Sequence, residues 1–271
     1  NLEFDHADIF ADLAAIQTQF HHLVRTIPHN GLIVSNAHEA ALDETLNKGA
    51  WTPIARFGSG ADMVDWQIAN VGDDDSFDVL FEGKLQGRVH WDVTGAHNRL
   101  NALAAIAAAR HVGVAPSTSI DALSRYLMPK RRMEIKGVIH GITVYDDFAH
   151  HPTAIATTVA GLRKRVGAGR ILAVLEPRSN TMKLGVMKAA LPDSLRDADW
   201  VFGYGATEGS SALGWDLAES LSPLGDKAQA FSDLDELVQA VKAQAQAGDH
   251  ILVMSNGGFG GVHQKLLDAL K

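Results

Sequence analysis

The chain has 271 residues, 46% of them apolar, and its 32 acidic and 24 basic side chains give a formal charge of -8. This size and apolar content can form two hydrophobic cores, so two domains are expected. The negative charge argues against a nucleic-acid partner or an anionic membrane surface, and no run approaches the roughly 20 apolar residues of a membrane span. The absence of cysteine excludes disulfides and thiolate chemistry and is typical of a cytoplasmic location.

The opening stretch NLEFDHADIF (1–10) predicts the end of a strand followed by a loop and a helix. Because the chain begins at Asn1 without an initiator methionine, we expect a fragment whose beginning is missing. Four side chains of this stretch could ligate a metal ion, namely Glu3, Asp5, His6 and Asp8. The same acids could instead cap the amino terminus of a helix, and both interpretations stay open at this point.

The rest of the first half predicts short strands and helices. An apolar strand at 31–36 leads into a helix at 38–49, whose last residue is a glycine, as at a helix C-cap. Residues 51–93 alternate apolar and polar side chains and are interrupted by glycine-containing turns, which predicts strands joined by tight turns. An alanine-rich helix is expected at 97–113.

A domain boundary is predicted in LMPKRR (127–132), where Pro129 interrupts the pattern and a basic cluster follows. The expected domains are therefore 1–128 and 129–271. The second of these has the more regular alternation of strands and helices.

The second half begins with a predicted hairpin at 133–147 that turns at His140 and Gly141. Helical stretches then alternate with apolar strands at 170–176, 199–205, 228–233 and 250–256. This alternation predicts an α/β fold with a mostly parallel sheet. Ligands of such sheets bind at the carboxyl ends of the strands, and polar stretches follow three of these ends.

The stretch DDFAHHP places two carboxylates, two imidazoles and a proline in seven residues at the end of the hairpin. The titratable residues are Asp146, Asp147, His150 and His151. Pro152 suits the first turn of the helix that follows. These side chains could form a polar site, or they could only cap the loop and the helix, and this loop alone does not decide between the two.

Two further polar stretches follow strands. In EPRSNTMK (176–183), the side chains of Arg178, Ser179 and Asn180 suit the binding of a carboxylate. The alternative is a solvated loop in which Arg178 pairs with Glu176 or another acid. SNGGFGG (255–261) opens a helix, as phosphate-binding glycine loops do. Too few residues follow it for a dinucleotide fold, so a dinucleotide fingerprint is improbable.

The start of the alanine-rich helix carries Asn98 and Asn101 one turn apart, where their amides could bind the edge of a purine. Ordinary helix capping by Asn98 is the alternative. The spacing of the histidines of the first half matches no common zinc pattern, so we interpret them as structural or solvated: His21, His22, His29 and His38.

Read in order, the stretches NLEFDHAD, TGAHNRLNALAA, KRRM, VYDDFAHHPTAI, LEPRSNTMK and MSNGGFGG resemble the Mur ligase family, the ATP-dependent enzymes that add amino acids or peptides to UDP-linked muramic acid. The resemblance covers essentially the whole chain. It implies the later part of a central ATP-binding domain, followed by a Rossmann-like carboxyl-terminal domain with a mostly parallel sheet. Within the family the chain resembles the branch that uses UDP-N-acetylmuramate.

The resemblance also implies the chemistry. The muramate carboxylate is phosphorylated by ATP, and the amine of the tripeptide L-alanyl-γ-D-glutamyl-meso-diaminopimelate then attacks the acyl phosphate, as a step of peptidoglycan recycling. Phosphoryl transfer mainly demands positioning and charge neutralisation. The alternative amine donor is L-alanine. A non-catalytic module that binds murein peptides is a second alternative, and an NAD-dependent oxidoreductase, suggested only by GGFGG, is a third.

The family's functional residues are carried over motif by motif. The implied ATP site has Asn98 and Asn101 at the adenine, His97 beside the nucleotide, Asp147 at the ribose and Arg132 at the γ-phosphate. Implied catalytic residues are Arg132, His150 and His151. Implied substrate-binding residues are Asp146, Arg178, Ser179 and Asn180. His6 is the implied magnesium ligand, although magnesium generally prefers oxygen ligands.

Two departures from the family pattern matter. The glycine-rich phosphate loop of the G-x-x-G-K-[ST] kind does not occur, nor does any stretch that resembles the UDP-binding amino-terminal domain. We therefore expect this fragment not to turn over ATP by itself. No lysine lies between His6 and Lys48, where several family members carry a carbamylated lysine, so the ligands of a second metal ion are not identified.

Overall fold

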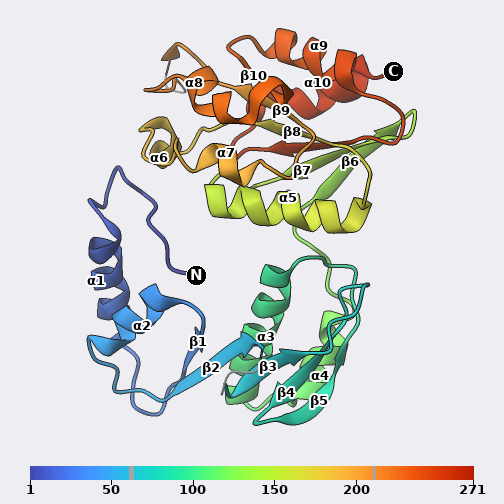
Figure 1. The fold of residues 1–271 in the computed structure, drawn as a ribbon. Coiled ribbons are helices and arrows are strands. Elements are labelled where there is room, and N and C mark those ends of the chain that lie inside the picture. The colour runs from blue at the N-terminus through green and yellow to red at the C-terminus, as the bar shows by residue number, and fades with distance from the viewer. Residues whose placement is uncertain (61–63, 210–211) are drawn as a thin grey trace. The chain divides into compact units, whose positions relative to one another are not determined.

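The computed structural model describes residues 1–60, 64–209 and 212–271. The chain divides into two compact units, Asn1–Leu127 and Met128–Lys271, and each is described by itself (Figure 1). Among the described residues, no helix has the length and apolar character needed to cross a membrane.

The first unit is a five-stranded sheet with helices. Its elements are α1 (Leu13–Val24), β1 (Ile33–Asn36), α2 (Ala40–Asn47), β2 (Ile54–Ser59), β3 (Trp66–Ala69), β4 (Phe77–Phe81), β5 (Lys84–Val89), α3 (Ala96–His111) and α4 (Pro116–Leu123). The strands are ordered β1-β2-β3-β4-β5. The first three strands are parallel, whereas β4 is antiparallel to both of its neighbours. The strands expected within 51–93 are therefore confirmed as β2 to β5.

The core of the first unit lies between this sheet and α3. Trp66 and Ile68 of β3 are buried, and the residue between them is not, because successive side chains of a strand point to opposite faces. Leu103 and Ile106 of α3 are fully buried in the same cluster. This packing fixes the position of the first turns of α3, where Asn98 and Asn101 lie.

The second unit is a six-stranded sheet covered by helices on both faces. Its elements are β6 (Glu134–Ile139), β7 (Ile142–Asp147), α5 (Pro152–Val166), β8 (Ile171–Leu175), α6 (Asn180–Lys183), α7 (Leu191–Ser194), β9 (Trp200–Tyr204), α8 (Leu217–Leu221), η2 (Ser222–Lys227), β10 (Ala228–Phe231), α9 (Leu234–Gln244), β11 (His250–Met254), η3 (Phe259–Gly261) and α10 (Val262–Ala269). The order is β10-β9-β8-β11-β7-β6. All neighbouring pairs are parallel except β6 with β7. The predicted α/β class with a mostly parallel sheet is confirmed.

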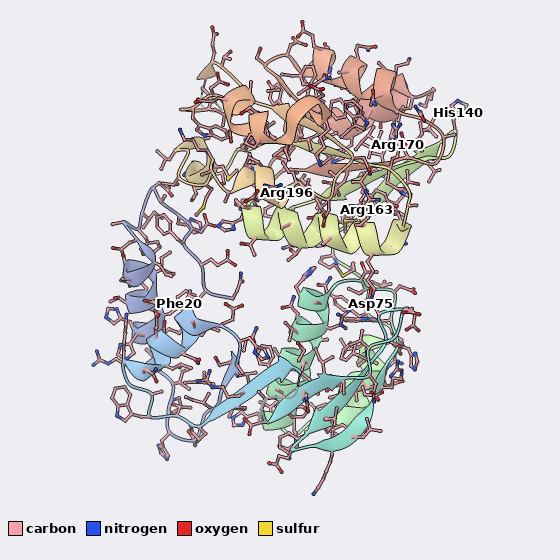
Figure 2. All side chains as sticks on the ribbon, viewed as in Figure 1. Phe20, Asp75, His140, Arg163, Arg170 and Arg196 are labelled. Atoms are coloured by element: carbon pink, nitrogen blue, oxygen red, sulfur yellow. The ribbon has the colours of Figure 1, made fainter. Side chains whose placement is uncertain are left out.

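The hairpin of β6 and β7 turns where it was expected. His140 and Gly141 both have positive φ angles, 49° and 80°, which is the backbone of the two-residue turns that match the twist of a hairpin. Figure 2 shows His140 at the tip of this hairpin. The turn sets the register of β7 and therefore the place where Asp146 and Asp147 leave the sheet.

Helices cover the two faces of the second sheet with separate cores. The core clusters place α5, α7 and α8 on one face and α9 and α10 on the other. Figure 1 shows α5 on one side of the sheet and α9 and α10 on the opposite side. All five residues of β8 are buried, since side chains of both faces of a central parallel strand meet helices. The apolar run ILAVL at 171–175 thus reflects burial on two sides.

A substitution in β8 tests the contribution of this core. Leu172 is fully buried beneath α9 and α10, so Leu172→Ala should lower the free energy of unfolding by about 2 to 5 kcal/mol, measured by urea denaturation. Leu184 is 61% exposed, and the matched control Leu184→Ala should change the same quantity by less than about 0.5 kcal/mol. Equal effects of the two substitutions would contradict this packing.

Candidate functional site

Three chain exits meet at one edge of the second sheet. Strand β11 pairs with β7 on one side and with β8 on the other, all in parallel, so their carboxyl ends share one edge. Hydrogen bonds continue past the strand ends, from the Ser255 amide to the Asp147 carbonyl and from the Glu176 amide to the Met254 carbonyl. The Ser255 hydroxyl donates to the Glu176 carboxylate at 2.6 Å. The polar stretches after β7, β8 and β11 are therefore adjacent, as predicted.

Asp146 and Asp147 face opposite sides of the sheet, because they are successive residues of β7. Asp147 points to the α5 side, where the hydroxyl of Thr158 donates to it at 3.3 Å. Asp146 points to the α10 side, where Nε2 of His263 lies 3.1 Å from its Oδ1. Two adjacent acids therefore have separate partners on separate faces.

Asp147 organises the chain around the start of α5. Its carboxylate accepts the backbone amides of Ala149 at 2.8 Å and Met133 at 2.9 Å, in addition to the Thr158 hydroxyl. Burial raises the pKa of the Asp147 carboxyl above its ordinary value, and the two amides oppose that rise. A carboxylate has about four lone-pair sites, so these three donors leave one acceptor site on Asp147.

Asp146 is held between two basic side chains. Nε of Arg131 lies 3.5 Å from one carboxylate oxygen and His263 lies beside the other. Burial lowers the pKa of His263 below its ordinary value, while the Asp146 carboxylate opposes that shift. The structure therefore shows Asp146 as a buried, paired residue, and its expected contact with substrate stays a prediction.

Phe148 gathers two of the candidate catalytic residues. The Arg132 guanidinium carbon lies 5.7 Å from the centre of the Phe148 ring, and that of Arg131 lies 5.1 Å from it. The ring of His150 meets the ring of Phe148 edge-on at 5.4 Å, and its Nδ1 lies 2.9 Å from the Phe148 carbonyl oxygen. Arg131 and Arg132, which precede β6, thus meet His150 around an aromatic ring that the sequence motifs did not single out.

His151 and Ser179 both cap helices. Nδ1 of His151 accepts the amide of Thr153 at 3.4 Å at the start of α5, and Oγ of Ser179 accepts the amide of Met182 at 3.2 Å at the start of α6. Asn180 is the exposed first residue of α6. Capping explains the presence of these residue types in these loops, and their roles in binding or catalysis stay predictions.

Arg178 extends from the loop after β8 to the glycine loop after β11. A side-chain carbon added at Gly257 would lie only 1.7 Å from the Arg178 guanidinium, so the arginine occupies the space above that glycine. The Glu176 carboxylate accepts the Ser255 hydroxyl, which is a different partner from the Arg178 that the solvated-loop interpretation offered. Arg178 is exposed and available to a ligand at this edge.

The candidate adenine-binding residues lie in the first unit, in the first turns of α3. Asn98 donates from Nδ2 to the Thr94 carbonyl at 2.8 Å, so its amide also anchors the start of the helix. The His97 ring packs over Gly95, the N-cap, where an added side-chain carbon would lie 2.9 Å from it. Asn101 is exposed one turn later.

His6 has an exposed side chain in the loop before α1, and its backbone carbonyl accepts the amides of Ile9 and Phe10. Over the ranges that the structure describes, no three His, Asp or Glu side chains are grouped so as to hold a metal ion. His6 thus offers a single imidazole here, and its expected role as a magnesium ligand stays a prediction. Two of the other histidines contact backbone carbonyls, His21 that of Gly49 and His38 that of Ser59.

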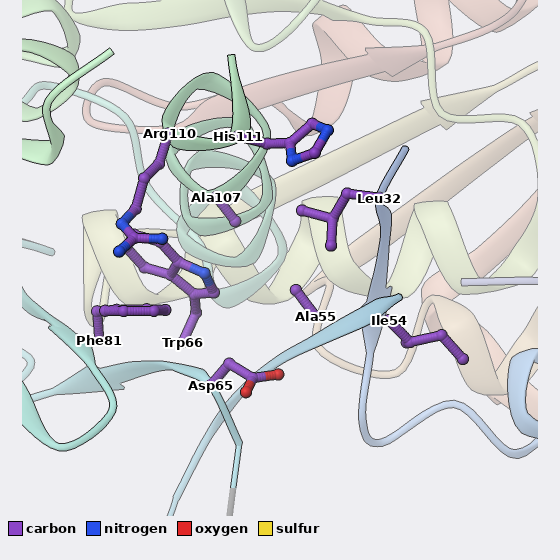
Figure 3. Close-up of a pocket in the computed structure, with 9 residues that line it drawn as sticks. All are labelled: Leu32, Ile54, Ala55, Asp65, Trp66, Phe81, Ala107, Arg110 and His111. Atoms are coloured by element: carbon purple, nitrogen blue, oxygen red, sulfur yellow. The ribbon is translucent and has the colours of Figure 1, made fainter. Parts of the chain in front are cut away.

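A pocket of about 260 Å³ lies elsewhere in the first unit (Figure 3). Leu32, Ile54 and Trp66 line it near the starts of β1, β2 and β3, and Arg110 and His111 close it at the end of α3. The Arg110 guanidinium lies 4.0 Å from the centre of the Phe81 ring. The pocket is thus at the opposite end of α3 from Asn98, and it is not part of the candidate site.

Family comparisons match both units. Residues 1–109 match the model of the Mur ligase middle domain, and residues 131–257 match that of the Mur ligase glutamate ligase domain. The chain belongs to the Mur ligase family. The expected resemblance is therefore confirmed, and the edge formed by β7, β8 and β11 lies in the part that matches the glutamate ligase domain.

Individual Mur ligases are similar over the whole chain. The UDP-N-acetylmuramate--L-alanyl-gamma-D-glutamyl-meso-2,6-diaminoheptandioate ligases of Escherichia coli and Haemophilus influenzae are each 50% identical over 272 residues, and the chain spans 58% and 59% of their lengths. The UDP-N-acetylmuramate--L-alanine ligase of Caldanaerobacter subterraneus is 28% identical, and 60% of it is covered. A crystal structure of a murein peptide ligase from Psychrobacter arcticus is 44% identical in sequence, with a TM-score of 0.74. The match includes 96% of this chain and 55% of the chain in that crystal structure.

The environment of His263 predicts how stability of this Mur ligase chain depends on pH. Burial depresses the folded-state pKa of His263, with Arg131 and Lys136 adding to the effect and Asp146 opposing it. The unfolded state therefore binds the proton more tightly, so the free energy of unfolding should fall as pH drops below about 6.5. Urea denaturation at pH 7.5 and pH 5.5 measures this effect. Between these two pH values, the free energy of unfolding should fall less in His263→Gln than in the unsubstituted chain.

The exposed histidine of the β6–β7 turn provides the control. His140→Gln should keep the pH dependence of the unsubstituted chain, because that side chain is exposed. If His263→Gln and the unsubstituted chain lost the same free energy over this interval, His263 would not be responsible for the dependence.

Proposed function

We propose that the natural protein that carries this chain is an ATP-dependent ligase that joins the tripeptide L-alanyl-γ-D-glutamyl-meso-diaminopimelate to UDP-N-acetylmuramate. The observation that carries the proposal is 50% identity across both units to two ligases named for this reaction, against 28% to a ligase named for L-alanine. One sheet edge groups Arg178 and Asp147 with Arg132 and His150, which lie around Phe148, and this grouping is consistent with the proposal. The proposed setting is peptidoglycan recycling in the cytoplasm.

The proposed reaction has two steps. A muramate carboxylate oxygen attacks the γ-phosphorus of ATP, the bond to the β-phosphate oxygen breaks, and ADP leaves. The tripeptide amine then attacks the acyl carbon, and the tetrahedral intermediate expels inorganic phosphate while the nitrogen loses a proton. Both steps concentrate negative charge on oxygen, so fixed cationic groups and precise positioning are the expected contributions of the protein.

The proposed nucleotide roles fit the local chemistry of the side chains. Arg132 carries a guanidinium that can neutralise charge on the transferred phosphoryl group, and it lies over the Phe148 ring at 5.7 Å from the ring centre. Asp147 keeps one acceptor site for a ribose hydroxyl after its three internal donors. Asn98 and Asn101 remain the proposed adenine contacts, with His97 beside the nucleotide. Magnesium belongs to the proposal as the partner of ATP, with His6 as its candidate ligand.

The proposed binding of the amine donor uses the loops after β8 and β11. The tripeptide is rich in carboxylates, and the guanidinium of Arg178 can hold one by two parallel hydrogen bonds. Ser179 and Asn180 lie at the start of α6 beside it. Asp146, His150 and His151 complete the proposed surroundings, Asp146 from a buried position and His150 beside the Phe148 ring.

A direct assay tests the function. The natural protein is incubated with ATP, magnesium, UDP-N-acetylmuramate and the free tripeptide, and ADP release and the mass of the UDP-linked product are measured. We expect one ADP for each UDP-N-acetylmuramoyl-tripeptide formed. A product with L-alanine and none with the tripeptide would favour the alternative ligase, and the absence of any ligated product with either would refute the proposal.

A substitution at Arg178 tests the proposed peptide contact. Arg178→Ala should raise the KM for the tripeptide about tenfold to a hundredfold, because a charged hydrogen bond of about 1.5 to 3 kcal/mol is lost. The KM for ATP should change little. Arg196→Ala is the matched control, since Arg196 is an exposed arginine of the same unit that pairs with Asp193. An unchanged tripeptide KM in Arg178→Ala would exclude the contact.

A further inference from the structure

Arg131 lies near the start of the second unit, between Met128 and β6, one residue before Arg132. Its backbone is in the left-handed region, with φ of 62°, which is unfavourable for a side chain of this size. Two hydrogen bonds hold it there: its amide donates to the Glu134 carboxylate at 2.9 Å, and its carbonyl accepts the Phe148 amide at 2.9 Å. The backbone of Arg131 is therefore tied to the first residue of β6 and to the residue that follows β7.

The Arg131 side chain connects three other segments of the second unit. Its Nη2 donates to the carbonyl oxygens of Ser255 at 2.5 Å and Gly257 at 2.8 Å, both in the glycine loop after β11. Its Nε faces the buried Asp146 carboxylate at 3.5 Å. Its guanidinium carbon lies over the Phe148 ring, 5.1 Å from the ring centre. One guanidinium thus contacts Phe148, the end of β7 at Asp146 and the glycine loop after β11.

Only an arginine can make this set of contacts. The guanidinium is planar and presents donors in a fixed fork, so Nε and Nη2 reach separate acceptors while the flat face packs on an aromatic ring. A lysine ammonium at the same place could neutralise Asp146, but as a compact point charge it would not match two carbonyls and the ring together. Nε2 of His263 lies 3.1 Å from the other oxygen of Asp146, so this one buried carboxylate faces both basic side chains.

We propose that Arg131 is a positioning residue for the ligase reaction, which holds the glycine loop 255–261 and the Phe148 ring so that Arg132 and His150 keep a single arrangement. This inference rests on the proposed function for its kinetic part. Arg132 follows Arg131 directly in the chain, and both guanidinium groups lie over the Phe148 ring. Loss of the Arg131 contacts should therefore also increase the motion of the Arg132 side chain. Phe259 anchors the second half of the glycine loop in the apolar core, whereas the first half is bonded by Arg131 at the carbonyls of Ser255 and Gly257.

A second arginine provides a matched control. Arg163 of α5 also binds backbone carbonyls, those of Gly167 at 2.9 Å and Gly169 at 2.6 Å, and it pairs with the Asp199 carboxylate at 2.5 Å. Arg163 lies in the last turn of α5 (Figure 2). Arg131 instead contacts the glycine loop after β11 and Asp146 at the end of β7. Its loss removes a similar set of bonds from the same unit at a place remote from Phe148.

The experiment compares Arg131→Met, Arg131→Lys and Arg163→Met in the natural protein, with two measurements. Amide hydrogen exchange of peptides that contain 255–261 reports on the glycine loop and requires no activity. Steady-state kinetics with ATP, UDP-N-acetylmuramate and the tripeptide report on the reaction. In Arg131→Met we expect exchange in the loop to rise about tenfold or more and kcat to fall about tenfold to a hundredfold, with each KM changed less than about threefold.

The control and the conservative variant sharpen the outcome. Arg163→Met should leave exchange at 255–261 and kcat within about twofold of the unsubstituted protein, and Arg131→Lys should recover only part of kcat. The proposal is overturned if Arg131→Met leaves either loop exchange or kcat unchanged, or if Arg163→Met produces the same two changes. If the unsubstituted protein lacks ligase activity, the proposed function fails, and the exchange measurement still decides whether Arg131 restrains the loop.

Discussion

The parallel pairing of β11 with both β7 and β8 is the constraint on which the candidate site depends. Because all three strands run the same way, three loops distant in sequence leave the sheet at one edge, within hydrogen-bonding distance of one another. The helices on both faces keep the strands in register through two apolar cores. Two apolar cores, which include none of the polar groups at this edge, therefore position those groups. The chemistry of the loops can differ among Mur ligases without a change of fold.

The two adjacent acids of β7 show how this edge uses the alternation of a strand. Asp147 restrains the start of α5 and the segment before β6 on one face, and Asp146 pairs with Arg131 and His263 on the other. Each buried carboxylate thus has donors or basic groups on its own side, which offset part of the cost of burying charge. Phe148, the next residue, presents the ring over which Arg131 and Arg132 lie. The three consecutive residues 146–148 thus connect both faces of the sheet to residues 131–133, which precede β6.

Much of the fold was accessible to sequence reasoning, since periodicity and turn chemistry are local. The hairpin turn at His140 and Gly141, the α/β alternation and the polar strand ends are all confirmed. Phe148, Arg131 and His263 were not selected, because their importance lies in contacts between residues far apart in the chain, such as Arg131 with Gly257. A weak signal existed in KRRM, where a second arginine precedes the one that the family resemblance emphasises. The roles assigned to individual site residues stay predictions.

The sequence by itself determined the class of fold, the family and the positions of the polar loops, because hydrophobic period, turn residues and short motifs are properties of neighbouring residues. Only the tertiary structure decided which of the polar residues are used internally. Asp146 is enclosed by two bases, His151 and Ser179 cap helices, and Arg178 stays exposed above Gly257. That division depends on which strands become neighbours and which face each side chain takes, and both follow from burial of the two cores as a whole.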